Sequence, residues 1–187
     1  VADPEMPSSE LGSQIVQAYD AFYASVYPAY PRTQSAVDLG STYDDLEDAV
    51  DGLALALMAQ LPDQQSSLTV AREATPEFSG YPYVDLHDLA ENVAAEFSDP
   101  RVDDAVSNLM DALDAAVLAE EHHPDSEHAH GISIYFPLEE ESYDLRYQGD
   151  QDVLRFTAEG YWDDCLWRYY GHVPPQDYRY YLAIVHG

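Results

Sequence analysis

The chain has 187 residues, 46% of them hydrophobic, which is enough for one domain with a sizeable core and argues against disorder. Seven basic residues, all arginine, stand against 36 acidic ones and give a formal net charge of −29. A surface of this sign repels nucleic acid phosphates and anionic lipid, and no run of about 18 apolar residues is present, so we exclude nucleic acid partners and a membrane span.

The acid-rich, lysine-free composition predicts a salt-loving source. Molar salt shortens the Debye length to about 3 Å and removes most of the self-repulsion of such a surface. An ordinary secreted acidic protein with a few bound divalent cations is the alternative. The chain starts at Val1 without a methionine or a signal-peptide pattern, which indicates a processed or excised segment.

The first third of the chain predicts a helix, a short strand and a second helix. The first helix begins near Ser8, and its apolar face carries Leu11, Ile15, Tyr19 and Phe22. Residues 33–39 are typical of a strand. Acidic side chains then crowd the first turns of a helix whose buried stripe is Leu46, Val50, Leu53, Leu57 and Leu61.

The middle of the chain predicts one extended segment and two helices. Residues 68–80 carry no clear period, and residues 81–86 are predicted to be extended. A short helix with Leu89, Val93 and Phe97 follows and breaks at Asp99-Pro100. The spacing of apolar residues from Val102 onward predicts a further helix up to Glu120.

Residues 131–137 (GISIYFP) predict the strand around which the fold is organised. The segment is β-branched and aromatic, shows little polar alternation and is bounded by Gly131 and Pro137, so it is predicted to be buried on both faces. Helical patterns on either side of it favour an α/β fold in which helices flank a largely parallel sheet.

The last part of the chain predicts an edge strand, a helix and a final strand. Tyr143, Leu145 and Tyr147 alternate as in an edge strand. Residues 153–170 are typical of a helix that ends at Gly171. Residues 178–185 are typical of a last strand beyond Pro174-Pro175.

Four of these segments, in this order, resemble the C-terminal half of clostripain-like cysteine peptidases. Residues 129–137 (AHGISIYFP) are similar to the family's G-[IL]-S-I-Y-F-P segment, residues 35–39 (SAVDL) to its S-A-[IV]-D-L strand, and residues 83–90 (YVDLHDLA) to its Y-[IV]-D-L-x-D-[FL]-A segment. The family's closing amphipathic helix is matched by Phe156, Trp162, Leu166 and Tyr169. Each segment is a short hydrophobic pattern, but their order and spacing argue against coincidence.

The resemblance implies part of a caspase-like sheet flanked by helices, without its N-terminal strands. Residues 1–171 would form the C-terminal portion of that domain, and residues 172–187 an extension outside the matched region. The family's catalytic His-Gly and Asp-x-Cys segments lie upstream of the matched region, so no catalytic residue is assigned in this chain. The family also implies cleavage of peptide or protein substrates after basic residues, a location outside the cell or at its surface, and calcium as a candidate cofactor.

Residues 121–130 form a histidine-rich tract that is the one candidate for independent chemistry. His122, His123, His128 and His130, with nearby carboxylates, offer ligands of the kind that hold Zn²⁺, Ni²⁺ or Cu²⁺. The alternative is a solvated loop between a helix and the core strand, because such tracts are a compositional cue and not a spacing motif.

The single cysteine, Cys165, excludes an internal disulfide and raises the question of a nucleophile. His172 lies seven residues further on and is a candidate base. The spacing of Trp162, Cys165, Leu166 and Tyr169 instead predicts that Cys165 is a small buried residue on the core face of a helix.

Sixteen tyrosines favour contact with another chain. Clusters such as Tyr23, Tyr27 and Tyr30, and Tyr178, Tyr180 and Tyr181, give rigid apolar area with a polar tip, which suits a partner segment or a homo-oligomer as well as the core and rim of one domain.

Two functions remain open. The chain is either the non-catalytic C-terminal part of a clostripain-like endopeptidase or a catalytically inactive scaffold or assembly subunit at a cell surface.

Overall fold

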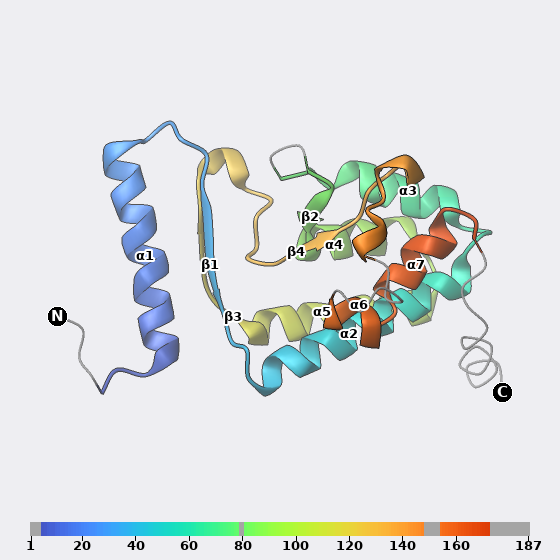
Figure 1. The fold of residues 1–187 in the computed structure, drawn as a ribbon, viewed down its shortest axis with the longest axis horizontal. Coiled ribbons are helices and arrows are strands. Elements are labelled where there is room, and N and C mark those ends of the chain that lie inside the picture. Colours follow the sequence, from blue (N-terminus) through green and yellow to red (C-terminus); the bar gives the residue numbers. More distant parts are fainter. Residues whose placement is uncertain (1–4, 79–80, 148–153, 173–187) are drawn as a thin grey trace.

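The computed structural model describes residues 5–78, 81–147 and 154–172 and shows an α/β protein in which helices surround two small antiparallel sheets (Figure 1). No helix in these three ranges is both long and apolar enough to cross a membrane. The predicted final strand at residues 178–185 and most of the extension at residues 172–187 lie outside the described residues.

The first sheet, here called sheet A, pairs β1 (Thr33–Val37) with β3 (Val117–His122). Thr33 lies opposite His122, and the register shifts between Ala36 and Val37, which indicates a bulge. The first helix, α1 (Ser8–Val26), packs on one face of this sheet and lies at one end of the molecule (Figure 1). Sheet A and α1 therefore form a layer pair beside the main helical body.

The second sheet, sheet B, pairs β2 (Tyr83–Asp85) with β4 (Ser133–Tyr135), so that Val84 lies opposite Ile134. Glu77 adds an isolated bridge to Val84 on the other side of β2. Gly131 carries the chain from the region of sheet A into β4 at a φ of 107°, where a Cβ would come within 3.0 Å of Val117 Cγ1. Glycine at this crossing therefore avoids both backbone strain and a clash.

Helices enclose sheet B and build the main core. Asp85 caps α4 (Leu86–Glu96) by accepting from the backbone N–H groups of His87 and Asp88, and Asp99 caps α5 (Pro100–Ala116) immediately before Pro100 at the first helical position. The core helices are α2 (Ser41–Gln60), α3 (Gln65–Ala74), α4 (Leu86–Glu96), α5 (Pro100–Ala116), α6 (Arg155–Glu159) and α7 (Trp162–Tyr169).

Several predicted elements differ from the structure. The described strands pair in antiparallel and not in parallel fashion. The helix predicted up to Glu120 ends at Ala116, and the residues after it form β3, because pairing with β1 outweighs a helical pattern that the next residues only weakly continue. The predicted edge strand around Leu145 is replaced by two short 3-10 turns, Glu140–Ser142 and Leu145–Tyr147.

The apolar face of α1 is also used differently from the prediction. The residue of α1 that is buried against sheet A is Val16, at 1% exposure. Leu11, Ile15 and Phe22 are 41%, 55% and 54% exposed. Of the apolar face named from the sequence, these three residues are therefore exposed, and Tyr19 is half-buried.

Candidate functional site

The candidate site lies where β2 passes into α4, and Asp85 is its central residue. The Asp85 side chain is 1% exposed. Its Oδ1 accepts from the backbone N–H groups of His87 (3.0 Å) and Asp88 (3.1 Å), and its Oδ2 accepts from the backbone N–H of His130 (2.7 Å). One carboxylate thus fixes the start of α4 and ties to it a segment 45 residues away in sequence.

His130 also contacts Asp85 through its ring. The distance from His130 Nδ1 to Asp85 Oδ1 is 3.0 Å, and the ring is 35% exposed. An ionised carboxylate only accepts hydrogen bonds, so Nδ1 carries the proton and Nε2 is left as the basic nitrogen. His87 stacks on His130 with ring centroids 4.3 Å apart. The three residues form a layered Asp-His-His arrangement.

A second carboxylate and a third histidine extend this cluster. Asp88 Oδ2 lies 3.7 Å from His128 Nδ1. Burial raises the pKa of Asp88, the neighbouring His128 opposes that rise, and the Asp85 charge adds to it. We name Asp85, His87, Asp88, His128 and His130 the α4 acid–histidine cluster.

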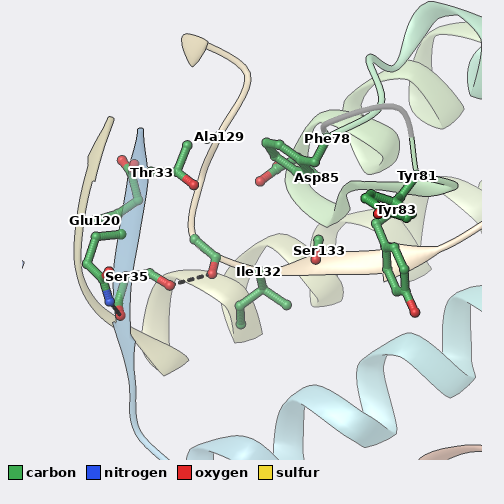
Figure 2. Close-up of a pocket in the computed structure, with 12 residues that line it drawn as sticks. Thr33, Ser35, Phe78, Tyr81, Tyr83, Asp85, Glu120, Ala129, Ile132 and Ser133 are labelled. Atoms are coloured by element: carbon green, nitrogen blue, oxygen red, sulfur yellow. Dashed lines mark hydrogen bonds between the residues drawn. The ribbon is translucent and has the colours of Figure 1, made fainter. Parts of the chain in front are cut away.

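A cleft of about 760 Å³ adjoins the cluster and separates sheet A from sheet B. Figure 2 shows Thr33, Ser35 and Glu120 on the sheet A side and the rings of Phe78, Tyr81 and Tyr83 on the other. Across the base of the cleft, the Ser35 hydroxyl donates to the carbonyl of Gly131 at 2.6 Å, the dashed line in Figure 2. The cleft thus has one hydroxyl-bearing wall and one aromatic wall.

The four histidines that were predicted as metal ligands lie in different surroundings. His122 contacts the carboxylate of Glu120 at 3.0 Å, and His123 Nε2 lies 3.0 Å from the carbonyl of Pro28. His128 and His130 instead belong to the α4 acid–histidine cluster, beyond the 3-10 turn at Pro124–Ser126. The four rings are therefore held by separate partners and are not gathered at one point.

The described side chains show no arrangement of metal ligands around a single point. Within the described ranges, no group of three or more His, Cys, Asp or Glu residues converges on a point where an ion would bind. We therefore derive no chemical step through zinc or calcium.

Cys165 is buried at 1% exposure on the core face of α7, as its spacing predicted. Burial and the nearby Asp164 raise the pKa of the Cys165 thiol to about 12, and Arg168 opposes this shift. His172, the candidate base, lies 2.8 Å from Glu140 and stacks on Trp167. A thiol held in its neutral form inside the core is not suited to nucleophilic attack.

The arrangement around Asp85 can orient the imidazole of His130 through its Nδ1. In the part of the chain that the structure describes, no Ser, Thr or Cys side chain is hydrogen-bonded to His130, so the pair has no nucleophile to activate. The Asp85–His130 pair positions the segment that leads into β4.

Sequence reasoning identified His130 but missed its partner Asp85. The signal was present, because an aspartate that ends an extended run and begins a helical one is a common N-cap. That signal predicts the two hydrogen bonds to α4, but not the contact with a residue from a distant segment.

Comparisons with known proteins found no protein similar to this chain. No family model, no curated protein and no solved structure matches the chain.

Proposed function

We propose that this chain is the non-catalytic C-terminal part of a clostripain-like cysteine endopeptidase and completes an α/β fold around a Cys–His site carried by an upstream segment. The observation that carries the proposal is that three of the segments resembling that family each form a hydrogen bond to the fourth, residues 129–137.

The segment formed by residues 129–137 is the centre of these contacts. Ser35, from the SAVDL segment, donates to Gly131 at 2.6 Å, and Asp85, from the YVDLHDLA segment, accepts from His130 at 2.7 Å. The indole N–H of Trp162, from the closing helix, donates to the Tyr135 carbonyl at 2.8 Å. Phe136 meets Trp162 and Tyr169 edge to face, with ring centroids 5.8 and 5.3 Å apart.

The finer part of the proposal is that sheets A and B are two portions of one caspase-like sheet that upstream strands complete. Two-stranded sheets are marginal by themselves and gain stability from further strands. The 760 Å³ cleft between the two sheets offers space beside both of them. Ile134 and Phe136 are already 5% and 0% exposed, so the added strands would have to pair at sheet edges instead of covering these residues.

The burial and raised pKa of Cys165 are consistent with a non-catalytic role for this chain. Thiol-peptidase chemistry needs a thiolate within hydrogen-bond reach of a histidine and N–H donors for the oxyanion. Cys165 is buried, and its pKa is raised to about 12. In the proposed enzyme the thiolate, its histidine and any calcium site belong to the upstream segment, the substrate is a peptide or protein cleaved after a basic residue, and the complete protein works outside the cell in high salt.

The test uses an irreversible thiol-directed peptide probe ending in arginine. The 187-residue chain alone should remain unlabelled and should cleave no arginyl or lysyl amide. Co-expression with its upstream coding segment should give turnover and labelling on the upstream part, unchanged in a Cys165→Ala control. Labelling at Cys165 in the folded chain would contradict both the burial argument and the proposed role.

The second candidate function, an inactive scaffold or assembly subunit at a cell surface, is favoured by the exposed side chains of α1 and of the loop that follows it. Phe22 and Val26 are 54% and 49% exposed, and Tyr27 and Tyr30 are 55% and 61% exposed. Reading the sequence encoded directly upstream of Val1 discriminates the two functions. A His-Gly pair followed some tens of residues later by Asp-x-Cys supports the peptidase, and their absence supports the scaffold.

A further inference from the structure

We propose that α1 is a homodimer interface, on which a second copy of this chain packs its own α1 in antiparallel orientation. The proposal does not depend on the peptidase role. It rests on an apolar stripe of α1, which we define as Leu11, Ile15, Phe22 and Val26.

The α1 stripe is a continuous exposed apolar surface. Its four side chains are between 41% and 55% exposed. At about 100° per residue they fall within about 60° of arc on the helix, and so form one line along it. Val16, the residue that α1 buries against sheet A, points to a different side, so the stripe is not the face that already has a partner.

Charge distinguishes this helix from the rest of the surface. Among the 19 residues of α1, only Glu10 and Asp20 are charged, and Asp20 is paired with Arg32 at 2.5 Å. Helix α2, by contrast, carries Asp44, Asp45, Glu47, Asp48 and Asp51 within its 20 residues. In a chain of net charge −29, the α1 stripe is thus a place where a second, equally acidic copy can approach without bringing carboxylates together.

The spacing of the stripe is symmetric and therefore suits a twofold axis. Ile15 and Phe22 lie at equal distances from the midpoint between Ala18 and Tyr19, and so do Leu11 and Val26. A twofold axis at this midpoint makes the two helices antiparallel and places Ile15 against Phe22 of the second copy and Leu11 against Val26. The small Ala18 near the axis lets the helices approach closely.

Helix dipoles favour the antiparallel over the parallel arrangement. A parallel pair brings the two positive N-terminal ends of α1 together, whereas an antiparallel pair opposes the two dipoles and separates the N-terminal ends by the helix length of about 28 Å. The absence of any basic residue from α1 argues against the other common use of such a stripe, which is binding to an anionic lipid surface. The small contact area predicts a weak dimer that forms best in molar salt.

The first experiment is sedimentation equilibrium of the full 187-residue chain in molar sodium chloride over a range of concentrations. We expect a monomer–dimer equilibrium, and Phe22→Glu should weaken it by at least about tenfold. Val70→Glu is the matched control, because Val70 is 46% exposed on α3 and outside the stripe, and it should leave the equilibrium unchanged. Circular dichroism verifies that both variants are folded.

Cysteine cross-linking tests the orientation. Cys165 is buried, so Leu11→Cys and Val26→Cys each add one reactive thiol. An equal mixture of the two variants should oxidise to the mixed disulfide, and neither should couple with itself. A chain that is monomeric at all concentrations, a dimer that Phe22→Glu does not affect, or self-coupling of Leu11→Cys would each overturn the proposal.

Discussion

At the scale of single residues, Asp85 is the side chain on which most local structure depends. It accepts four hydrogen bonds while being 1% exposed, and so fixes both the first turn of α4 and the segment before β4. A buried carboxylate of this kind stabilises the protein only while its donors remain paired with it.

We expect Asp85→Asn to lower the free energy of unfolding by about 3 kcal/mol, because the amide N–H₂ would face either the backbone N–H of His130 or the donors at the start of α4. Urea denaturation measures the change. Asp111→Asn, an exposed position on α5, removes the same charge and serves as the control. Equal stabilities for the two variants would show that the Asp85 network is not important for folding.

Asp164 predicts an unusual dependence of stability on pH. Burial, with the neighbouring charges of Asp163 and Asp51, raises the pKa of Asp164 to about 8, whereas an unfolded aspartate has its ordinary pKa of 3.8. Between these values the folded protein holds one more proton than the unfolded chain. This contribution to stability is therefore fully present near pH 4 and is lost as the pH rises through 8.

Asp164→Asn keeps the shape of the protonated acid without its titration. The substitution should raise the free energy of unfolding at pH 8 by on the order of 2 kcal/mol and leave it nearly unchanged at pH 4. Thermal unfolding at several pH values, in molar salt, measures the difference, again with Asp111→Asn for comparison. A gain that is the same at both pH values would contradict the raised pKa.

At the scale of elements, Arg72 connects α3 to the end of β4. The Arg72 side chain is almost fully buried, and its Nε–H donates to the carbonyl of Phe136 at 2.6 Å. Its terminal N–H groups donate to the carbonyl of Thr75 at 3.2 Å and to the carboxylate of Glu77. The planar guanidinium thus satisfies three groups in three directions, which a lysine ammonium cannot do from the same position.

Arg72→Lys should therefore destabilise the protein by about 3 kcal/mol and loosen the packing of α3 on β4. Arg101→Lys is the control, because Arg101 pairs with Asp99 at the surface, where such pairs contribute about 1 kcal/mol or less. Urea denaturation measures stability, and the near-UV circular dichroism of the two tryptophans, Trp162 and Trp167, reports their packing. A tolerated Arg72→Lys would mean that hydration replaces the lost hydrogen bonds.

The elements also show what the sequence could and could not predict. The long apolar periods of α2 and α5 and the punctuated strand at β4 were predicted, since each pattern is local. The antiparallel pairing of β1 with β3 was not predicted, because the sequence of residues 33–37 and 117–122 does not indicate which strand, some 80 residues away, each one pairs with. The same holds for the candidate site. His130 could be identified because it belongs to a local histidine-rich tract, whereas its contact with Asp85 depends on how the chain folds.

At the scale of the whole molecule, charge sets the conditions under which the fold is stable. Arg32, Arg72, Arg101 and Arg146 each pair with a carboxylate, and only seven arginines are present in the sequence. Most of the 36 acidic residues therefore repel one another across the surface unless salt screens them.

We expect the melting temperature to fall by many degrees when sodium chloride is lowered from molar concentration to about 10 mM. Differential scanning calorimetry measures the shift. Sucrose at matched osmolality serves as the control, because it strengthens burial without screening charge. A melting temperature that salt does not change would refute the salt-loving interpretation.

The position of α1 and sheet A beside the main body has a consequence for how the protein opens. The buried residues of the main core come from none of α1, β1 and β3, although Val37 packs against that core from its edge. We therefore expect these three elements to unfold together, at a lower free energy than the rest, in a partial opening that leaves α2 and α5 intact. In hydrogen exchange on the native chain, their amides should exchange at one common rate, well before those of Leu53 and Leu109, and dimerisation through α1 should slow that common rate as protein concentration rises.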